Sequence, residues 1–318
     1  MIRALAGLAA LGITGFAAHR YLIHVPWPAP PPLGSSLRRG ELRVGDRRRT
    51  FAYYAPRDLP PGAPLLLAFH GSKGDGEGFR RRTVHRFDEL ADREGFLVVY
   101  PDGFEGHWND CRTVATYSAR TQRIDDIGFV RALIAHFRGA HDIDASRVFA
   151  VGWSNGGHFC FRLAFEVPEA IRAIAAVSAN LPTEDNCDCT RRGQPLSALI
   201  MNGTRDPLNP HGGGLVTIFG FGRRGTVVSS GETARSFASW AGITSEPRVE
   251  RFPSRDAALW VERQTWSSGA GIEVVLDTVH GGGHVVPQRA VRAERILGPT
   301  NLDFDGPGAI WSFFARRG

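Results

Sequence analysis

Residues Val148 to Gly157 read V-F-A-V-G-W-S-N-G-G, an apolar run that stops abruptly at a serine held between glycines. Within this run, Gly152 to Gly156 has the G-x-S-x-G spacing of a nucleophile elbow, in which a buried strand turns sharply into a helix and exposes Ser154 at the tip. Glycines are required because a side chain on either side would meet the neighbouring strand or helix. Helix-compatible residues 158–166 follow. We therefore predict a strand, an elbow and a helix, and not an ordinary Gly-rich turn.

The composition is that of a globular protein, with 318 residues of which 42% are hydrophobic and 22% charged. No long linker divides the chain, so we predict one catalytic domain over residues 40–318. The net charge of +6 comes almost wholly from arginine, since Lys73 is the only lysine. The arginines are scattered without interleaved aromatic residues, and we predict no nucleic-acid partner.

The N-terminus is apolar. Residues 4–18 are apolar or small apart from one threonine, which is short for a bilayer span and suits the core of a signal peptide. We expect residues 1–25 to be a signal peptide or, because residues 21–25 could extend the apolar stretch, an uncleaved membrane anchor. Residues 26–39 read as a Pro-rich spacer. Both alternatives place the body of the protein outside the cytoplasm, secreted or periplasmic, with or without an N-terminal anchor.

Strands and helices alternate along the body. A hairpin is predicted over residues 42–54, where a Gly-Asp turn separates two β-prone segments. Further strands are predicted at 65–69, 97–100, 148–151, 174–177, 196–201, 259–265 and 272–279. Helices are predicted at 83–93, 127–138, 155–166, 233–240 and 308–315. This order requires an α/β fold with a mainly parallel sheet and helices on both faces.

A serine nucleophile needs a base, and the base needs an orienting acid. In sheet hydrolases these follow in the order Ser, Asp or Glu, then His, each after a strand. Asp206 follows the strand 196–201, and His280 and His284 follow the strand 272–279 within a glycine loop. The spacing leaves both histidines open as the base. A metal site on the same pair is disfavoured, because three consecutive glycines make a helix improbable there, and we predict no metal.

The tetrahedral intermediate of ester cleavage needs two backbone N–H donors. The N–H of Asn155, at the start of the helix after the elbow, is the first candidate. The second should come from the loop after an early strand, where Ser72 is our candidate and Lys73 the next.

Aromatic residues are the candidates for substrate binding. Trp108 is expected to wall the acyl pocket or to lie in the core. Residues 215–228 follow the acid and are too apolar for an ordinary solvated loop. We predict that Phe219 and Phe221 in this segment line or cover the acyl site, with a small satellite core as the alternative.

Three of the four cysteines lie in loop-like sequence. In an exported protein we expect Cys111 to form a disulfide with Cys187 or Cys189. Cys160 lies in the apolar helix after the elbow and is predicted to be a core residue.

Taken together, the motifs resemble those of the polyhydroxybutyrate depolymerase and feruloyl esterase group of α/β-hydrolases, similar to carbohydrate esterase family 1. The resemblance is carried by His70-Gly71, Tyr100 to Gly103, Trp108, Asp125 to Phe129, Gly152 to Gly157, Asn202 to Pro207 and Gly281 to His284. It implies an α/β-hydrolase fold with Ser154 as nucleophile, His284 as base and Asp206 as orienting acid, and it favours His284 over His280. The group's G-G-G-H-x-W-P motif has Val286 in place of its tryptophan.

The predicted function is hydrolysis of a carboxylic ester, of the hydroxyalkanoate or feruloyl type, through an acyl-enzyme and without a cofactor. Two alternatives remain. The same residues could transfer the acyl group to a sugar or lipid hydroxyl, or the chain could be a catalytically silent binding protein of the cell envelope.

Overall fold

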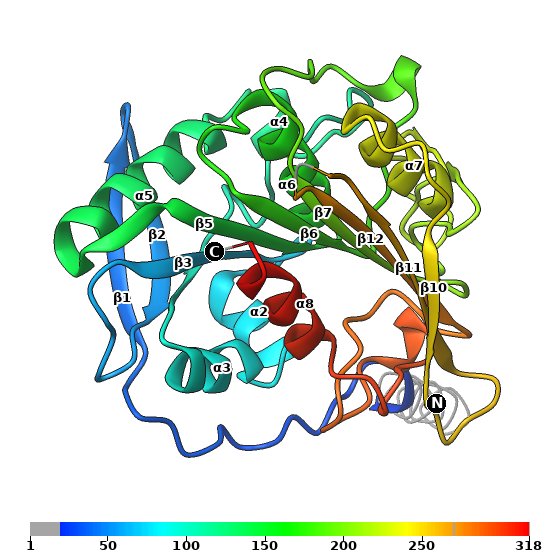
Figure 1. Ribbon diagram of the computed structural model, residues 1–318, viewed down its shortest axis with the longest axis horizontal. Coiled ribbons are helices and arrows are strands. Elements are labelled where there is room, and N and C mark those ends of the chain that lie inside the picture. The colour runs from blue at the N-terminus through cyan, green and yellow to red at the C-terminus, as the bar shows by residue number, and fades with distance from the viewer. Residues whose placement is uncertain (1–19, 270, 318) are drawn as a thin grey trace, which may run out of the picture.

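The computed structural model describes residues 20–269 and 271–317 and is built around a ten-stranded sheet (Figure 1). The strand order is β1-β2-β4-β3-β5-β6-β7-β12-β11-β10. The strands are β1 (Arg38–Val44), β2 (Arg47–Tyr54), β3 (Ala63–Phe69), β4 (Leu97–Pro101), β5 (Ile143–Trp153), β6 (Ala173–Val177), β7 (Ser197–Gly203), β10 (Arg248–Phe252), β11 (Trp260–Ser267) and β12 (Glu273–His280). From β4 to β12 neighbouring strands pair in parallel, whereas the pairs at both edges are antiparallel.

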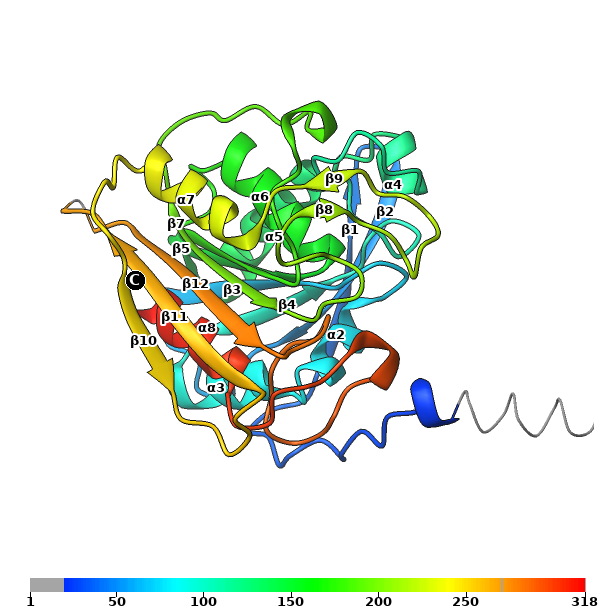
Figure 2. The same cartoon turned by 90° about the vertical axis from the view of Figure 1, so that its right-hand side faces the viewer.

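Helices cover both faces of this sheet (Figures 1 and 2). Apolar side chains of α2 (Gly76–Arg82), α3 (Arg86–Glu94) and α8 (Gly306–Ala315) form one core layer, and those of α5 (Asp126–His141), α6 (Asn155–Glu166) and α7 (Ser230–Trp240) form the other. The central strands are buried on both sides, which explains why they read as nearly continuous apolar runs in the sequence. A short helix α4 (Ser118–Thr121) and a two-stranded ribbon of β8 (Gly214–Leu215) and β9 (Thr226–Val227) lie outside these layers.

Most predicted elements are present, but α2, α4, β8, β9 and β10 were not predicted. The helix predicted over residues 83–93 is present as α3 but begins only at Arg86, because Val84 and His85 before it have positive φ. Helix α2, over residues 76–82, was not predicted. The glycines at the start of α2 concealed it from a propensity argument. The strand β10 was also not predicted, because three of its five residues are charged and almost all its side chains are exposed at this sheet edge, so it carries no apolar run.

The Pro-rich segment after residue 25 lies against the body of the protein. Val25 is buried, and the guanidinium of Arg82 lies 5.7 Å from the centre of the Trp27 ring. The end of the predicted spacer, from Arg38, belongs to strand β1. The apolar residues 4–18 lie outside the described residues. Within residues 20–269 and 271–317, no helix is long and apolar enough to cross a membrane.

The predicted disulfide of Cys111 is present, and the structure shows which of the two candidate cysteines is its partner. Cys111 forms a disulfide with Cys189, and Cys187 is a free thiol. Cys160 is buried within α6 as a core residue.

Candidate active site

The turn between β5 and α6 has the conformation of a nucleophile elbow. Ser154 has φ 56° and ψ −117°, a strained combination for a residue with a side chain. The flanking glycines allow the tight turn: a Cβ on Gly152 would lie 2.1 Å from the carbonyl oxygen of Gly156, and one on Gly156 would lie 2.3 Å from that of Phe69. Ser154 remains partly exposed at the tip. The tight turn thus places Ser154 at the carboxyl end of a central strand.

Asp206 and His284 are brought together by the loops after β7 and β12. The Nδ1 of His284 lies 2.7 Å from an Oδ of Asp206, and both side chains are almost fully buried. The other carboxylate oxygen accepts from the backbone N–H groups of Leu208 and Asn209, each at 2.8 Å. Because an ionised carboxylate only accepts hydrogen bonds, this arrangement assigns the proton to Nδ1 and leaves Nε2 free to accept one.

The glycine loop carries two histidines with different surroundings. The ring of His280 is stacked on Trp260 with centroids 3.9 Å apart, at the end of strand β12. The ring of His284 instead lies 5.3 Å from that of Trp153, the residue before Ser154. The structure therefore brings His284, and not His280, to the carboxylate and to the elbow.

The loop after β3 runs beside the elbow. A Cβ on Gly71 would lie 3.3 Å from the Cβ of Ser154. The N–H of Lys73 donates to the carbonyl of Gly106 at 2.8 Å, which removes Lys73 as a free donor. Within the described part of the chain, the N–H of Ser72 has no backbone carbonyl as partner. Ser72 is thus the better placed of the two predicted donors in this loop.

His70 fixes the shape of this loop, a role that the sequence alone did not show. Its Nε2 accepts from the N–H of Gly103 at 2.8 Å, so Nδ1 carries the proton and donates to the carbonyl of Gly71 at 2.7 Å. Burial lowers the pKa of this histidine, which keeps it neutral. His70 therefore ties the loop after β3 to the Asp102-Gly103 turn.

Arg82 connects the elbow to the segment after His284. The guanidinium of Arg82 lies 4.3 Å from the centre of the Trp153 ring and forms a two-point ion pair with Glu294, at 2.6 and 2.8 Å. The N–H of His284 donates to the carbonyl of Leu297 in the same segment. The Arg82 side chain thus connects helix α2 to the elbow and to the segment that follows the histidine loop.

Trp108 is a core residue, which corrects its prediction as a wall of the substrate pocket. The ring is fully buried between Phe69 and Phe159, and its Nε1 donates to the carbonyl of His70 at 3.0 Å. An aromatic residue that already fills an interior site has no face left for a substrate.

Phe219 and Phe221 lie at the tip of the segment 214–227, which we call the flap. They are 43% and 79% exposed, so the alternative of a satellite core is wrong. The flap begins close to the acid, because the N–H of Thr217 donates to the carbonyl of Leu208. It also reaches the loop after β4, where the guanidinium of Arg224 lies 5.1 Å from the centre of the Tyr117 ring. Among the described residues, the ring of His284 forms its aromatic contact with Trp153 and with neither of the two phenylalanines.

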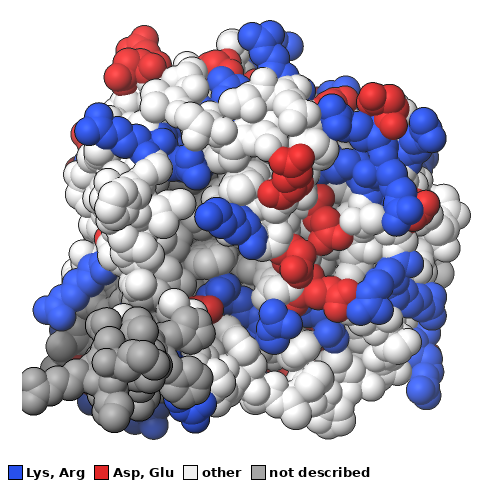
Figure 3. All heavy atoms as spheres, turned by 180° about the vertical axis from the view of Figure 1, so that it is seen from behind, with Lys and Arg blue, Asp and Glu red and all other residues white. Residues whose placement is uncertain are grey.

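Charge on this molecule is mixed. Figure 3 shows Lys and Arg side chains spread over one face, with Asp and Glu side chains gathered near its middle. Several arginines are paired, as in the two-point contact of Arg39 with Glu77 and the contact of Arg48 with Glu41. A groove of about 670 Å³ between β1, β2 and α2 is lined by these four residues, among others.

A strained serine after the central strand, an acid after β7 and a histidine after β12 define the α/β-hydrolase class of serine hydrolases. Comparison with known proteins leads to the same class. Residues 50–195 match the family model described as Esterase PHB depolymerase. NocK of Nocardia uniformis subsp. tsuyamanensis, which carries the name of an esterase, is 30% identical over 258 residues, or 78% of this chain and 73% of that protein.

More distant relatives agree. Feruloyl esterase B of Piromyces equi is 25% identical over 70% of this chain, which spans 39% of that longer protein. Among solved structures, an acetyl xylan esterase from Aspergillus awamori has the same fold, with a TM-score of 0.52 and 18% identity over 80% of this chain and 96% of the other. The chain belongs to the esterase family of the PHB depolymerases, as its motifs predicted, and is a serine-type carboxylic ester hydrolase.

Proposed function

We propose that Ser154 is the nucleophile of this esterase, with His284 as its base and Asp206 as the acid that orients the base. The observation that carries the proposal is the buried 2.7 Å contact of Asp206 with Nδ1 of His284, in a loop that lies against the elbow. Ser154 attacks the ester carbonyl while Nε2 of His284 takes its proton, and the alcohol leaves with that proton. Water, activated by the same nitrogen, then releases the acid.

The N–H groups of Asn155 and Ser72 are proposed as the donors to the oxyanion. Asn155 opens helix α6, whose first N–H groups have no partner within the helix and point toward its N-terminal end. The partial positive charge of this helix end favours the developing negative charge.

The substrate is proposed to be a carboxylic ester of the hydroxyalkanoate or feruloyl type, in keeping with the names of the relatives. We further propose that residues 40–318 are the catalytic domain, that it is exported, and that the exposed Phe219 and Phe221 contact the acyl or alcohol part of a bulky ester. The Cys111–Cys189 disulfide supports an oxidising compartment.

A panel of substrates tests the proposal. We expect p-nitrophenyl acetate, methyl ferulate and a hydroxybutyrate oligomer to be hydrolysed at rates that differ by substrate and vanish in Ser154→Ala. A preference for methyl ferulate or for the oligomer assigns the substrate type. In the presence of an alcohol acceptor, formation of a new ester in place of the free acid would contradict the assignment as a hydrolase.

A further inference from the structure

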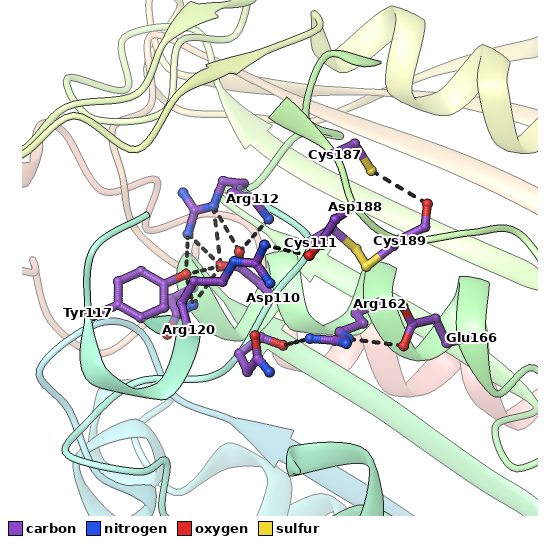
Figure 4. Close-up of a disulfide and its surroundings, with 12 residues drawn as sticks. Asp110, Cys111, Arg112, Tyr117, Arg120, Arg162, Glu166, Cys187, Asp188 and Cys189 are labelled. Carbon is purple, nitrogen blue, oxygen red and sulfur yellow. Dashed lines mark hydrogen bonds and ion pairs between the residues drawn. A yellow bond between two sulfur atoms is a disulfide. The ribbon is translucent and has the colours of Figure 1, made fainter. Parts of the chain in front are cut away.

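A buried charged cluster lies behind the oxyanion site in the loop after β4. Asp110 and Arg112 flank the disulfide cysteine Cys111, and the structure pairs them at 2.6 Å with side chains that are 0% and 3% exposed. Figure 4 shows the two side chains and the hydroxyl of Tyr117 converging, with the disulfide to Cys189 beside them. A pair of charges buried this completely is costly unless every charge is matched, so its presence at this position calls for a reason.

The cluster holds the side chain of Asn155. An Oδ of Asp110 accepts from the Nδ2 of Asn155 at 2.7 Å and from the hydroxyl of Tyr117 at 2.6 Å. The Oδ1 of Asn155 accepts from the backbone N–H of Trp108, also at 2.7 Å. Because a carboxylate accepts and a backbone N–H donates, the two contacts fix which end of the amide faces which partner.

Asp110 stays ionised despite its burial. Burial acts to raise the pKa of its carboxyl, but the adjacent Arg112 guanidinium and the hydrogen bonds hold that pKa well below its usual range. Arg112 donates to this carboxylate from its backbone N–H, Nε and a terminal nitrogen. The acceptor that Asn155 needs is therefore ionised at neutral pH.

We infer that Asp110 and Arg112 are positioning residues for catalysis: they fix Asn155 so that its backbone N–H points at the oxyanion. This inference rests on the proposed roles of Ser154 and Asn155. The disulfide contributes by anchoring the loop between the two charged residues to Cys189. A neutral amide in place of the carboxylate lacks the charge and the second acceptor oxygen that hold Asn155, Tyr117 and Arg112 together, so it holds the Asn155 side chain less firmly. A resulting shift of about 1 Å in the first turn of α6 can cost about a hundredfold in rate.

The test compares Asp110→Asn with a control in the same disulfide-linked region. Asp188→Asn is the control, since Asp188 is partly exposed and pairs with Arg120 at the surface. Active sites are first counted with a fluorophosphonate, and kcat and KM for p-nitrophenyl acetate are then measured per titrated site. Affinity for a trifluoromethyl ketone, which forms the tetrahedral adduct, is measured in parallel.

We expect Asp110→Asn to lower kcat per titrated site by about ten- to a hundredfold with little change in KM, and to weaken the ketone by a similar factor. The control should match the wild type in each respect. If Asp110→Asn does not fold, D110N/R112Q serves in its place, because it removes the unpaired Arg112 charge as well.

Wild-type kcat and ketone affinity per titrated site in a folded variant would overturn the inference, even if the melting temperature fell. A wild-type protein that the fluorophosphonate does not label at Ser154 would instead overturn the proposed function itself. The two failures are therefore distinguishable.

Discussion

The elbow and the flap both contact Tyr117, but Asn155 of the elbow is buried whereas the tip of the flap is exposed. On the elbow side, Asn155 is buried and its amide makes four hydrogen bonds to protein groups. On the flap side, Arg224 covers the Tyr117 ring, but the tip beyond it exposes Phe219 and Phe221. The difference indicates that the start of α6 is fixed by buried contacts, whereas the tip of the flap, which we propose to contact the substrate, is left open.

The largest effect is expected on the packed side. Ser154→Ala should lower kcat/KM by about three to six decades, because the nucleophile is lost while the fold is kept. Steady-state hydrolysis of p-nitrophenyl acetate measures the effect, and circular dichroism confirms the fold. Activity near that of the wild type would place the nucleophile elsewhere.

The second effect concerns the disulfide that joins the loop after β4 to the segment before β7. Replacing Cys111 and Cys189 with serine opens a loop of 78 residues and should lower the free energy of unfolding by about 3–5 kcal/mol in the chain-entropy model. Urea unfolding measures the change. Cys187→Ser, which leaves the bond intact, is the control and should unfold like the wild type. Thiol counting should find two free thiols, and four would disprove the bond.

Buried carboxylates offer a third comparison within the packed part of the molecule. Burial raises the pKa of Asp88 to about 6, with Arg80 and Tyr100 acting in the opposite direction. A raised carboxyl pKa favours the protonated form in the folded state, so this stabilisation is present below about pH 4 and lost as the pH rises through 6. The wild type should therefore lose up to about 3 kcal/mol relative to Asp88→Asn between pH 4 and pH 7.

The same measurement on Asp110→Asn should give the opposite pattern. The pKa of Asp110 is held below its usual range, so its contribution to stability should be constant from pH 7 down to about pH 5 and should be lost as the pH falls further. If the difference in free energy of unfolding between the wild type and Asp88→Asn does not change with pH, the pKa of Asp88 is not raised in the folded protein, and the prediction is wrong.

The smallest effect is expected on the open side. Replacing Phe219 and Phe221 together with alanine should change the free energy of unfolding by less than about 1 kcal/mol, since both are exposed. The KM for methyl ferulate or a hydroxybutyrate oligomer should rise about two- to tenfold, with that for p-nitrophenyl acetate unchanged. Equal KM values for all three esters would show that the tip takes no part in substrate binding.

The parts of this molecule that the sequence predicted are those with one dominant local cause. Buried parallel strands read as apolar runs, and the elbow needs glycines at fixed positions, so the run from Val148 to Gly157 predicts its own structure. The order of Asp206 and His284 after their strands likewise follows from the topology of the sheet.

The parts that the sequence did not predict depend on contacts between distant segments. Asp110-Cys111-Arg112 reads as a solvated loop, and only the approach of α6 shows that its charges are buried around Asn155. Trp108 gave no sign of whether it faces a pocket or the core, because burial of a loop residue depends on what folds over it.

Labelling with a fluorophosphonate tests the central claim most directly, because it reports the activated nucleophile without assuming a substrate. The protein is treated with the reagent, digested and analysed by mass spectrometry. The Ser154–His284–Asp206 assignment predicts one phosphonate per chain, on the peptide that contains Ser154, and none in His284→Ala. Modification of another serine, or undiminished labelling after the histidine is removed, would contradict it.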